Sequence, residues 1–215
     1  MSKTVLKALA VAAALAPAVG FAQGNKAATY ITDEEVKAVN ALPGVDRTIK
    51  VVDIGSENFA IGVIHRGATG GAARGTTGAA AGGAARGGAP QGEPCGEQST
   101  APATGTAGAI AHDQQTEGYL IISGGGTLVT GGKIVNGRRS PPESEVTKVL
   151  NGPSCSGMAV GADVVRKVVK TGDIIIIPAG VPHGWTDIGD HVDYLSFRPS
   201  ARVLEAGYTN PALKK

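Results

Sequence analysis

Short β-strand-forming runs, separated by turns that contain glycine, are the feature that most constrains the fold of this chain. The Gly124–Gly125 pair lies between two such runs and predicts a hairpin. The uninterrupted isoleucines at 174–177 predict a fully buried strand. Strands of this length with little helix indicate an all-β sandwich or barrel. The predicted strands cover residues 48–54, 58–65, 117–122, 126–130, 164–169, 173–177 and 192–197.

One short helix precedes these strands. Thr32 and Glu35 have the three-residue spacing of a capping box, in which each side chain bonds the other residue's backbone N–H. Pro43 and Gly44 then stop the helix. The sequence therefore predicts a helix over residues 33–42.

The first 22 residues have the pattern of an export signal. Lys3 and Lys7 precede an apolar stretch at 8–19 that is too short to span a bilayer as a helix. Gly20 and Ala22 supply small residues at the −3 and −1 positions of a cleavage site, which favours a cleaved signal over a retained anchor. We therefore expect secretion, most simply into a bacterial periplasm.

Removing these 22 of the 215 residues leaves 193 and takes the formal net charge from +2 to 0, because the segment carries two Lys and no acid. A neutral chain argues against nucleic acid as a partner, and against membrane association after cleavage. Residues 67–108 hold 13 of the 33 glycines, interleaved with Ala and Thr. Such a stretch cannot bury enough surface to order itself, so we expect a disordered insertion within one domain over residues 23–215.

Two segments carry the residues suited to chemistry. One contains His112 and Glu117 at the start of a strand-forming run, and the other contains His183 just after the isoleucine run. Two imidazoles and one carboxylate at a barrel mouth would form a facial triad with open positions on a metal ion.

These segments resemble the two motifs of the cupin superfamily. Gly172, Pro178, Gly180 and His183 fall on the spacing of the second motif, with Asp187 in place of its Asn. His112, Glu117 and Gly124 match the first motif when His112 is taken as its second His. The resemblance implies an all-β double-stranded β-helix, or jelly-roll barrel, with one short N-terminal helix.

The first motif is incomplete, because Ile110 occupies the position of its first His. The alternative alignment, with His112 as the first His, places Gln114 in the second position but leaves only two residues before Glu117. The resemblance thus implies a three-ligand site, or a fourth ligand from elsewhere. His65 is the candidate for that role, although a strand-end histidine more commonly makes a simple hydrogen bond.

Three further residues are candidates for the pocket. Tyr119 shares a strand face with Glu117, and Trp185 lies two residues beyond His183, so each either lines the pocket or belongs to the core. Arg198 either meets an anionic substrate or is solvated at a strand end.

Cys95 and Cys155 are the only two cysteines of the sequence, which excludes a four-thiolate zinc site and a disulfide scaffold. In an exported protein a pair is more often bridged than free. No neighbouring pattern supports a reactive or metal-binding thiol, so we expect a Cys95–Cys155 disulfide.

The cupin resemblance implies a metal-dependent protein that acts on a small organic molecule as a dioxygenase-like or isomerase-like enzyme, and the export pattern of residues 1–22 places it in the periplasm. Two His and one carboxylate favour Fe(II), with Mn, Zn, Ni or Cu as alternatives. A non-enzymatic small-ligand or metal-binding protein is the competing interpretation, and a homodimer is left open.

Overall fold

The computed structural model describes residues 27–69, 92–101 and 104–214. The predicted export segment, residues 1–22, lies outside the described residues, as do positions 70–91 and 102–103 of the predicted insertion. Among the described residues, no helix is long and apolar enough to cross a membrane.

Strands dominate the described part of the chain. Helical structure is limited to α1 (Asp33–Asn40) and the short turns η1 (Val146–Leu150) and η2 (Pro211–Leu213). The strands are β1 (Asp46–Asp53), β2 (Asn58–Gly67), β3 (Pro94–Cys95), β4 (Thr106–His112), β5 (Glu117–Thr130), β6 (Lys133–Arg139), β7 (Ser154–Val160), β8 (Val165–Lys170), β9 (Ile174–Ile177), β10 (His183–Thr186) and β11 (His191–Pro199).

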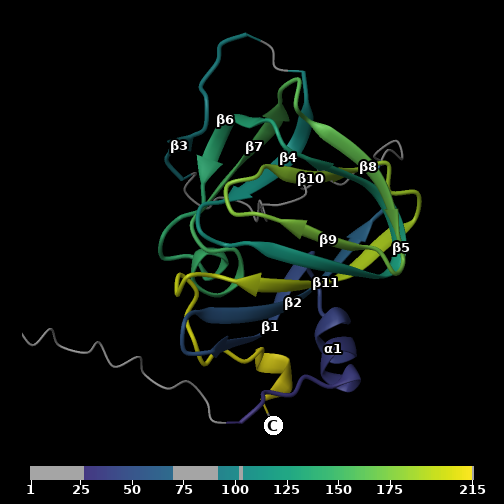
Figure 1. Ribbon diagram of the computed structural model, residues 1–215, viewed down its shortest axis with the longest axis vertical. Coiled ribbons are helices and arrows are strands. Elements are labelled where there is room, and N and C mark those ends of the chain that lie inside the picture. The colour runs from purple at the N-terminus through teal and green to yellow at the C-terminus, as the bar shows by residue number, and fades with distance from the viewer. Residues whose placement is uncertain (1–26, 70–91, 102–103, 215) are drawn as a thin grey trace, which may run out of the picture.

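Strand β5 belongs to two antiparallel sheets and joins them. Its first half pairs with β9 and β11, and β11 leads through β2 to β1. Its second half pairs with β8 and β10, and β10 leads through β4, β7 and β6 to β3. Figure 1 shows the two sheets wrapping around a common interior. The predicted all-β barrel with one short helix is confirmed.

The predicted hairpin at Gly124–Gly125 is wrong, because residues 117–130 form one continuous strand. The glycines allow the neighbouring strands to approach β5 where it passes between the sheets. A Cβ on Gly124, which has φ +68°, would lie 2.0 Å from the carbonyl oxygen of His191, and one on Gly125 would lie 2.5 Å from that of Val169. The irregular β5–β11 register around Ile121–Ser123 marks the same passage.

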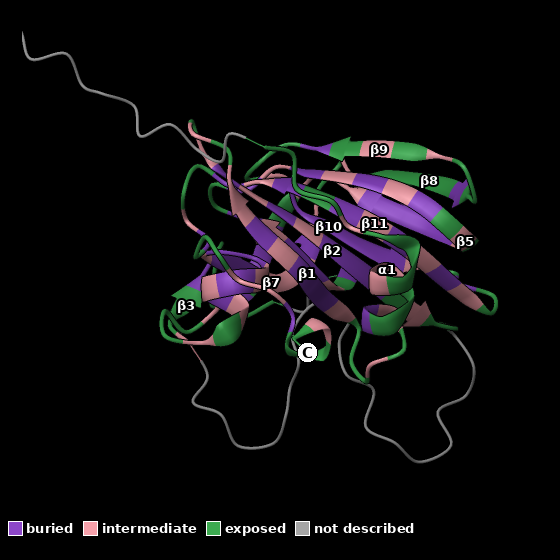
Figure 2. Cartoon of the chain, turned by 90° about the horizontal axis from the view of Figure 1, so that it is seen from below, coloured by how far each residue is buried: buried purple, intermediate pink, exposed green. Residues whose placement is uncertain are grey.

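The predicted helix and its capping box are confirmed. The Thr32 side chain accepts from the Glu35 backbone N–H, and the Glu35 side chain accepts from that of Thr32. The helix ends at Asn40, slightly before the predicted Leu42. Its buried Val39 packs with Ile49 and Val63 on the outer side of β1 and β2, which leaves the inner face of these strands for the barrel interior (Figure 2).

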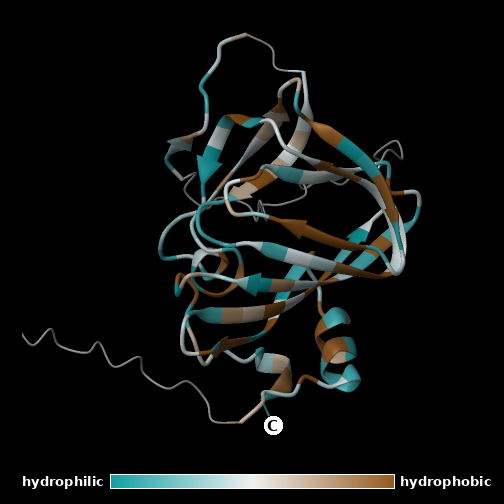
Figure 3. Ribbon diagram, viewed as in Figure 1, coloured by the Kyte–Doolittle hydropathy of each residue, from teal (hydrophilic) through white to brown (hydrophobic). Residues whose placement is uncertain are grey.

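The prediction that the isoleucine run is fully buried is wrong. Ile174 and Ile176 are each 74% exposed, whereas Ile177 is buried. Strand β9 pairs only with β5 among the described strands, so it forms a sheet edge with one face toward solvent. Figure 3 shows this hydrophobic edge strand, and Figure 2 shows its exposure. A run of identical residues could not reveal which of them face the interior.

The predicted disulfide between Cys95 and Cys155 is present and links residues 60 positions apart. It holds β3 against the sheet that contains β7, and β3 also pairs with β6. The sequence predicted a disordered insertion over residues 67–108. Its C-terminal part is instead ordered, because residues 92–101 and 104–108 include β3 and the start of β4. The disulfide and the strand pairings of β3 with β6 and of β4 with β7 order these residues despite their glycine content.

Candidate metal centre

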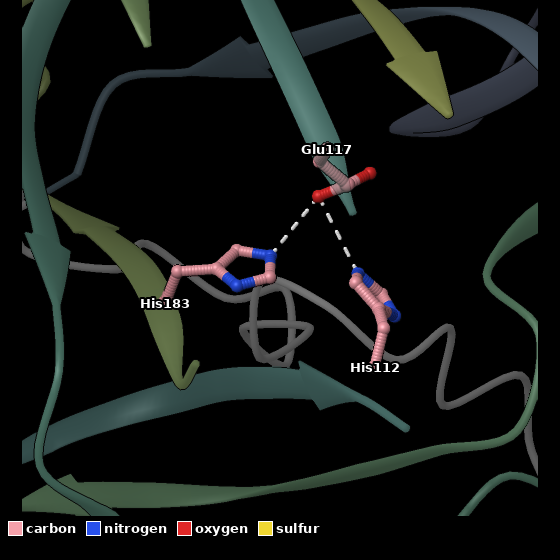
Figure 4. A group of neighbouring side chains, drawn as sticks. All are labelled: His112, Glu117 and His183. Carbon is pink, nitrogen blue, oxygen red and sulfur yellow. Dashed lines mark ion pairs between the residues drawn. The ribbon is translucent and has the colours of Figure 1, made fainter. Parts of the chain in front are cut away.

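His112, Glu117 and His183 meet across the interior of the barrel. His112 ends β4 and His183 begins β10, so the two imidazoles come from neighbouring strands of one sheet. Glu117 begins the first half of β5, in the other sheet, and points toward both rings (Figure 4). All three residues are buried, and one ligand atom of each lies within 4.8 Å of the others. The sequence-predicted triad is therefore assembled by the fold.

The hydrogen bond of His183 fixes which ring nitrogen faces the centre. Its Nδ1 lies 3.0 Å from the carbonyl oxygen of Val181, which can only accept, so the proton of the neutral ring is on Nδ1. The lone pair of Nε2 then faces Glu117 Oε2 at 3.1 Å. Two lone pairs at this separation repel unless a cation, either a proton or a metal ion, lies between them. A carbonyl-oriented imidazole of this kind is typical of metal ligands.

His112 approaches the same carboxylate oxygen, with 3.4 Å between its Nε2 and Glu117 Oε2. Burial, partly opposed by Glu117, lowers the pKa of His112, which favours the neutral ring that a metal requires. Its Nδ1 is buried and has no hydrogen-bond partner among the described residues. Three buried donor atoms thus converge on one point, and their chemistry fits a divalent ion.

The second oxygen of Glu117 is held by the chain itself. Oε1 accepts from Ser196 Oγ at 3.0 Å and from Arg198 Nε at 2.8 Å. Arg198 also donates from Nη2 to Asp46 Oδ2 at 2.6 Å and from Nη1 to the Leu150 carbonyl at 3.1 Å. These contacts orient the carboxylate so that only Oε2 faces the two histidines.

The position of Arg198 differs from the sequence interpretations. The residue is 1% exposed, so it is not a solvated strand end, and carboxylates of the chain, not a substrate, occupy its guanidinium. The alternation of Tyr194, Ser196 and Arg198 along β11 signalled its inward direction. No sequence signal pointed to Asp46, which lies 152 positions away.

Charges and hydrogen bonds keep Glu117 ionised inside the barrel. Burial alone would raise its pKa, but the guanidinium of Arg198 and the hydrogen bonds that the carboxylate accepts outweigh burial and hold the pKa well below its usual range. Tyr119 donates its hydroxyl to Glu117 Oε2 at 2.5 Å. Burial and the nearby carboxylate raise the pKa of Tyr119 well above its usual value, so the phenol keeps its proton. Tyr119 therefore contacts the metal-facing oxygen, as one of its two sequence interpretations allowed.

Two predicted candidates are not brought to the centre. The His65 side chain is 47% exposed and bonds Asp193 through Nδ1 at 2.6 Å, which matches the simple strand-end interpretation. Gln114 is exposed. Its neighbour Gln115 is instead 1% exposed, and neither its amide oxygen nor its amide nitrogen has a partner among the described residues. In an irregular loop no periodicity distinguishes these two glutamines.

Trp185 is 4% exposed and belongs to the hydrophobic core of the barrel. Its ring centroid lies 5.4 Å from that of Tyr194, which in turn lies 4.4 Å from that of Tyr119. The Tyr119 ring approaches His183 edge-on at 6.3 Å. These aromatic side chains therefore extend from the centre into the barrel.

Comparisons with known proteins give distant similarities in structure alone. No protein-family profile and no curated protein matches the chain. A cupin protein from Bacteroides fragilis is 16% identical over 70% of this chain and 72% of its own, with a TM-score of 0.29. An oxalate oxidase in complex with glycolate is 11% identical over 76% of this chain (TM-score 0.35), and a DMSP lyase from Ruegeria pomeroyi 12% over 79% (TM-score 0.33). This chain spans 55% and 53% of these last two proteins.

The arrangement of the chain itself decides the fold type. Two antiparallel sheets form a barrel, and the motif residues His112, Glu117 and His183 meet inside it. The chain therefore has an all-β barrel fold with an internal His/Glu/His group. Ile110, which occupies the position of the first His of the resembled motif, lies opposite His183 in the β4–β10 pairing. Within the described residues, the group of His, Cys, Asp and Glu side chains suited to a metal ion consists of three ligands.

Proposed function

We propose that this protein is a metal-dependent enzyme that acts on a small organic molecule, with His112, Glu117 and His183 as the metal ligands. The observation that supports it best is the buried convergence of Nε2, Oε2 and Nε2 atoms within 4.8 Å. Two imidazoles and one carboxylate leave positions open on a six-coordinate ion and favour Fe(II), with Mn, Zn, Ni or Cu as alternatives. A dioxygenase-like or isomerase-like reaction fits such a centre.

The chain's own groups would orient the ligands and hold protons. Val181 fixes the ring of His183, and Arg198 and Ser196 fix the carboxylate of Glu117. Tyr119 keeps the proton of its hydroxyl and donates it in a hydrogen bond to Oε2, so its oxygen can accept a hydrogen bond from a bound substrate. A bound divalent ion would supply Lewis-acid activation of a substrate oxygen, and Fe(II) would add redox chemistry with O₂.

A non-enzymatic metal-binding or small-ligand protein is the second candidate. The observation that favours it is the packing of Tyr119, Tyr194 and Trp185 beside the centre, with ring centroids separated by 4.4 and 5.4 Å. Aromatic side chains that fill the interior would leave less room for a substrate.

Metal analysis followed by an exchange test separates these candidates. The metal content of the purified wild-type protein is measured as isolated and after reloading with Fe(II), Mn(II) or Co(II). The His183→Ala variant is measured in the same way. We expect stoichiometric metal in the wild type and none in the variant; a wild type that retains no metal after reloading would refute the proposal. Azide is then titrated into the Co(II) form, and a saturable change in its visible absorption indicates an open position. A spectrum that azide leaves unchanged would favour the non-enzymatic candidate.

We further propose that the protein is exported to the periplasm. The charge and apolar pattern of residues 1–22 supports this, as does the Cys95–Cys155 disulfide, since such bonds persist in oxidising compartments. Expression in a Gram-negative host followed by mass spectrometry of the periplasmic fraction tests it. A chain that begins at Gln23 is the expected product, and an unprocessed chain retained in the cytoplasm would contradict the proposal.

A further inference from the structure

Arg66 is a partly buried arginine of β2 with one buried guanidinium nitrogen that lacks a partner among the described residues. Its Nε donates to the hydroxyl of Tyr194 at 3.0 Å, but its Nη1 is buried without a hydrogen-bond partner in the part of the chain that the structure describes. No carboxylate of the described residues lies within ion-pair distance of it. The segments outside the described residues contain no Asp or Glu, so no acidic side chain from there can neutralise it.

Among the described residues, Arg198 and Arg47 are the buried arginines, and both have more partners than Arg66. Arg198 has carboxylate partners in Glu117 and Asp46. Arg47 has none, but it donates to three backbone carbonyls and to the side chain of Asn40. A buried charge without a partner is strongly unfavourable, and natural cores avoid it. Among the described residues Arg66 has only the neutral hydroxyl of Tyr194 as a side-chain partner, so its charge is not compensated there.

A second unpaired donor lies on the same aromatic cluster. Trp185 is 4% exposed, and its Nε1–H has no partner among the described residues. Its ring packs against Tyr194, whose hydroxyl accepts from Arg66, so both residues contact the same side chain. Tyr194 packs on Tyr119, which bonds Glu117, and this links both donors to the metal centre.

We propose that Arg66 and Trp185 bind the carboxylate of an anionic ligand, and that the substrate is therefore a small carboxylic acid. The assignment to a substrate rests on the proposed function, whereas the anion site itself does not. A carboxylate has two oxygens, which match one guanidinium N–H and one indole N–H and neutralise the single charge of Arg66. A phosphate or sulfate would bring more charge and more acceptors than these donors satisfy.

Trp185 is the chain's single tryptophan, so its fluorescence reports directly on this site. Glycolate, malonate, succinate and benzoate are titrated into the protein in parallel with the corresponding amides. We expect a saturable fluorescence change with at least one acid and none with its amide. No saturable response to any of the four acids, or an equal response to acid and amide, would overturn the proposal.

Arg66→Met tests the role of the guanidinium, and Arg202→Met is the matched control, because Arg202 is an exposed partner of Asp53. We expect affinity for the acid to fall at least about tenfold in Arg66→Met and to change little in Arg202→Met. The ligand-free melting temperature separates a binding role from a structural one. An unpaired Arg66 predicts that Arg66→Met melts at or above the wild-type temperature; a lower value together with retained binding would overturn the proposal. If Arg66→Met does not fold, Arg66→Lys, which keeps the charge but not the planar fork, should show the same loss of affinity.

All titrations are run on EDTA-treated and on metal-loaded protein. Acid binding in both forms, without stoichiometric metal uptake, would support the anion site and refute the proposed enzyme. Metal uptake without acid binding would refute the anion site and leave the metal centre standing.

Discussion

Replacing Arg198 with Met should strongly destabilise the metal-free protein. Arg198 is 1% exposed and is paired with Glu117 at 2.8 Å and with Asp46 at 2.6 Å. Met preserves much of the side-chain volume but leaves both carboxylates without their cation. Breaking a buried pair in this way lowers the free energy of unfolding by about 3–5 kcal/mol. At about 2–4 °C per kcal/mol for a chain of this size, the melting temperature should fall by about 6–20 °C.

The pH dependence identifies the charge as the cause. The pKa of Glu117 is lowered well below 4.5 in the folded wild type, so its stabilising contribution is fully present above pH 4.5 and is lost as pH falls through the lowered value. Without Arg198, a cation that opposes burial is removed, so the pKa of Glu117 should rise toward its usual value, and the variant should gain less stability than the wild type as pH rises from acidic to neutral. The stability gap between wild type and variant should therefore widen from acidic to neutral pH.

Urea unfolding of EDTA-treated protein at several pH values measures this gap. The double variant Arg198→Met/Glu117→Gln provides the control, because it removes the stranded carboxylate together with its partner. We expect the double variant to be more stable at neutral pH than Arg198→Met alone. A gap that does not change with pH, or a double variant no more stable than the single one, would show that packing accounts for the loss.

Three further predictions concern the centre, the disulfide and the sheet edge. His183→Ala should abolish stoichiometric metal binding, whereas His65→Ala should retain it, since His65 bonds Asp193 away from the centre; elemental analysis of both variants decides this, and metal loss in His65→Ala would contradict the three-ligand site. Replacing Cys95 and Cys155 with Ser should lower the free energy of unfolding by about 4 kcal/mol, as loop closure over 60 residues predicts; a urea-unfolding loss under about 1 kcal/mol would exclude this entropic account. Ile177→Ala should cost about 2–5 kcal/mol and Ile176→Ala within about 0.5 kcal/mol, because only Ile177 is buried; equal losses in the two unfolding curves would show that the β9 edge is covered.

Local rules predicted the elements that depend on neighbouring residues. The capping box of Thr32 and Glu35 formed as expected because its two hydrogen bonds span three residues. The metal-type triad was also predictable, since motif spacing placed His112, Glu117 and His183 at the ends of strands. Local rules failed at Gly124–Gly125, where the same glycines that make a turn also allow close packing against a neighbouring strand.

The sequence by itself determined that this chain would form a β-rich barrel, bridge its two cysteines and carry two imidazoles and a carboxylate at strand ends. Only the tertiary structure decided which isoleucines of β9 are buried, that Arg198 pairs with Glu117 and Asp46, and that Arg66 meets no carboxylate of the described residues. The physical reason is the separation along the sequence over which each kind of interaction acts. Hydrogen-bond patterns and strand preference act between residues close along the chain, whereas the burial and pairing of a charge depend on strands that meet only when the barrel closes.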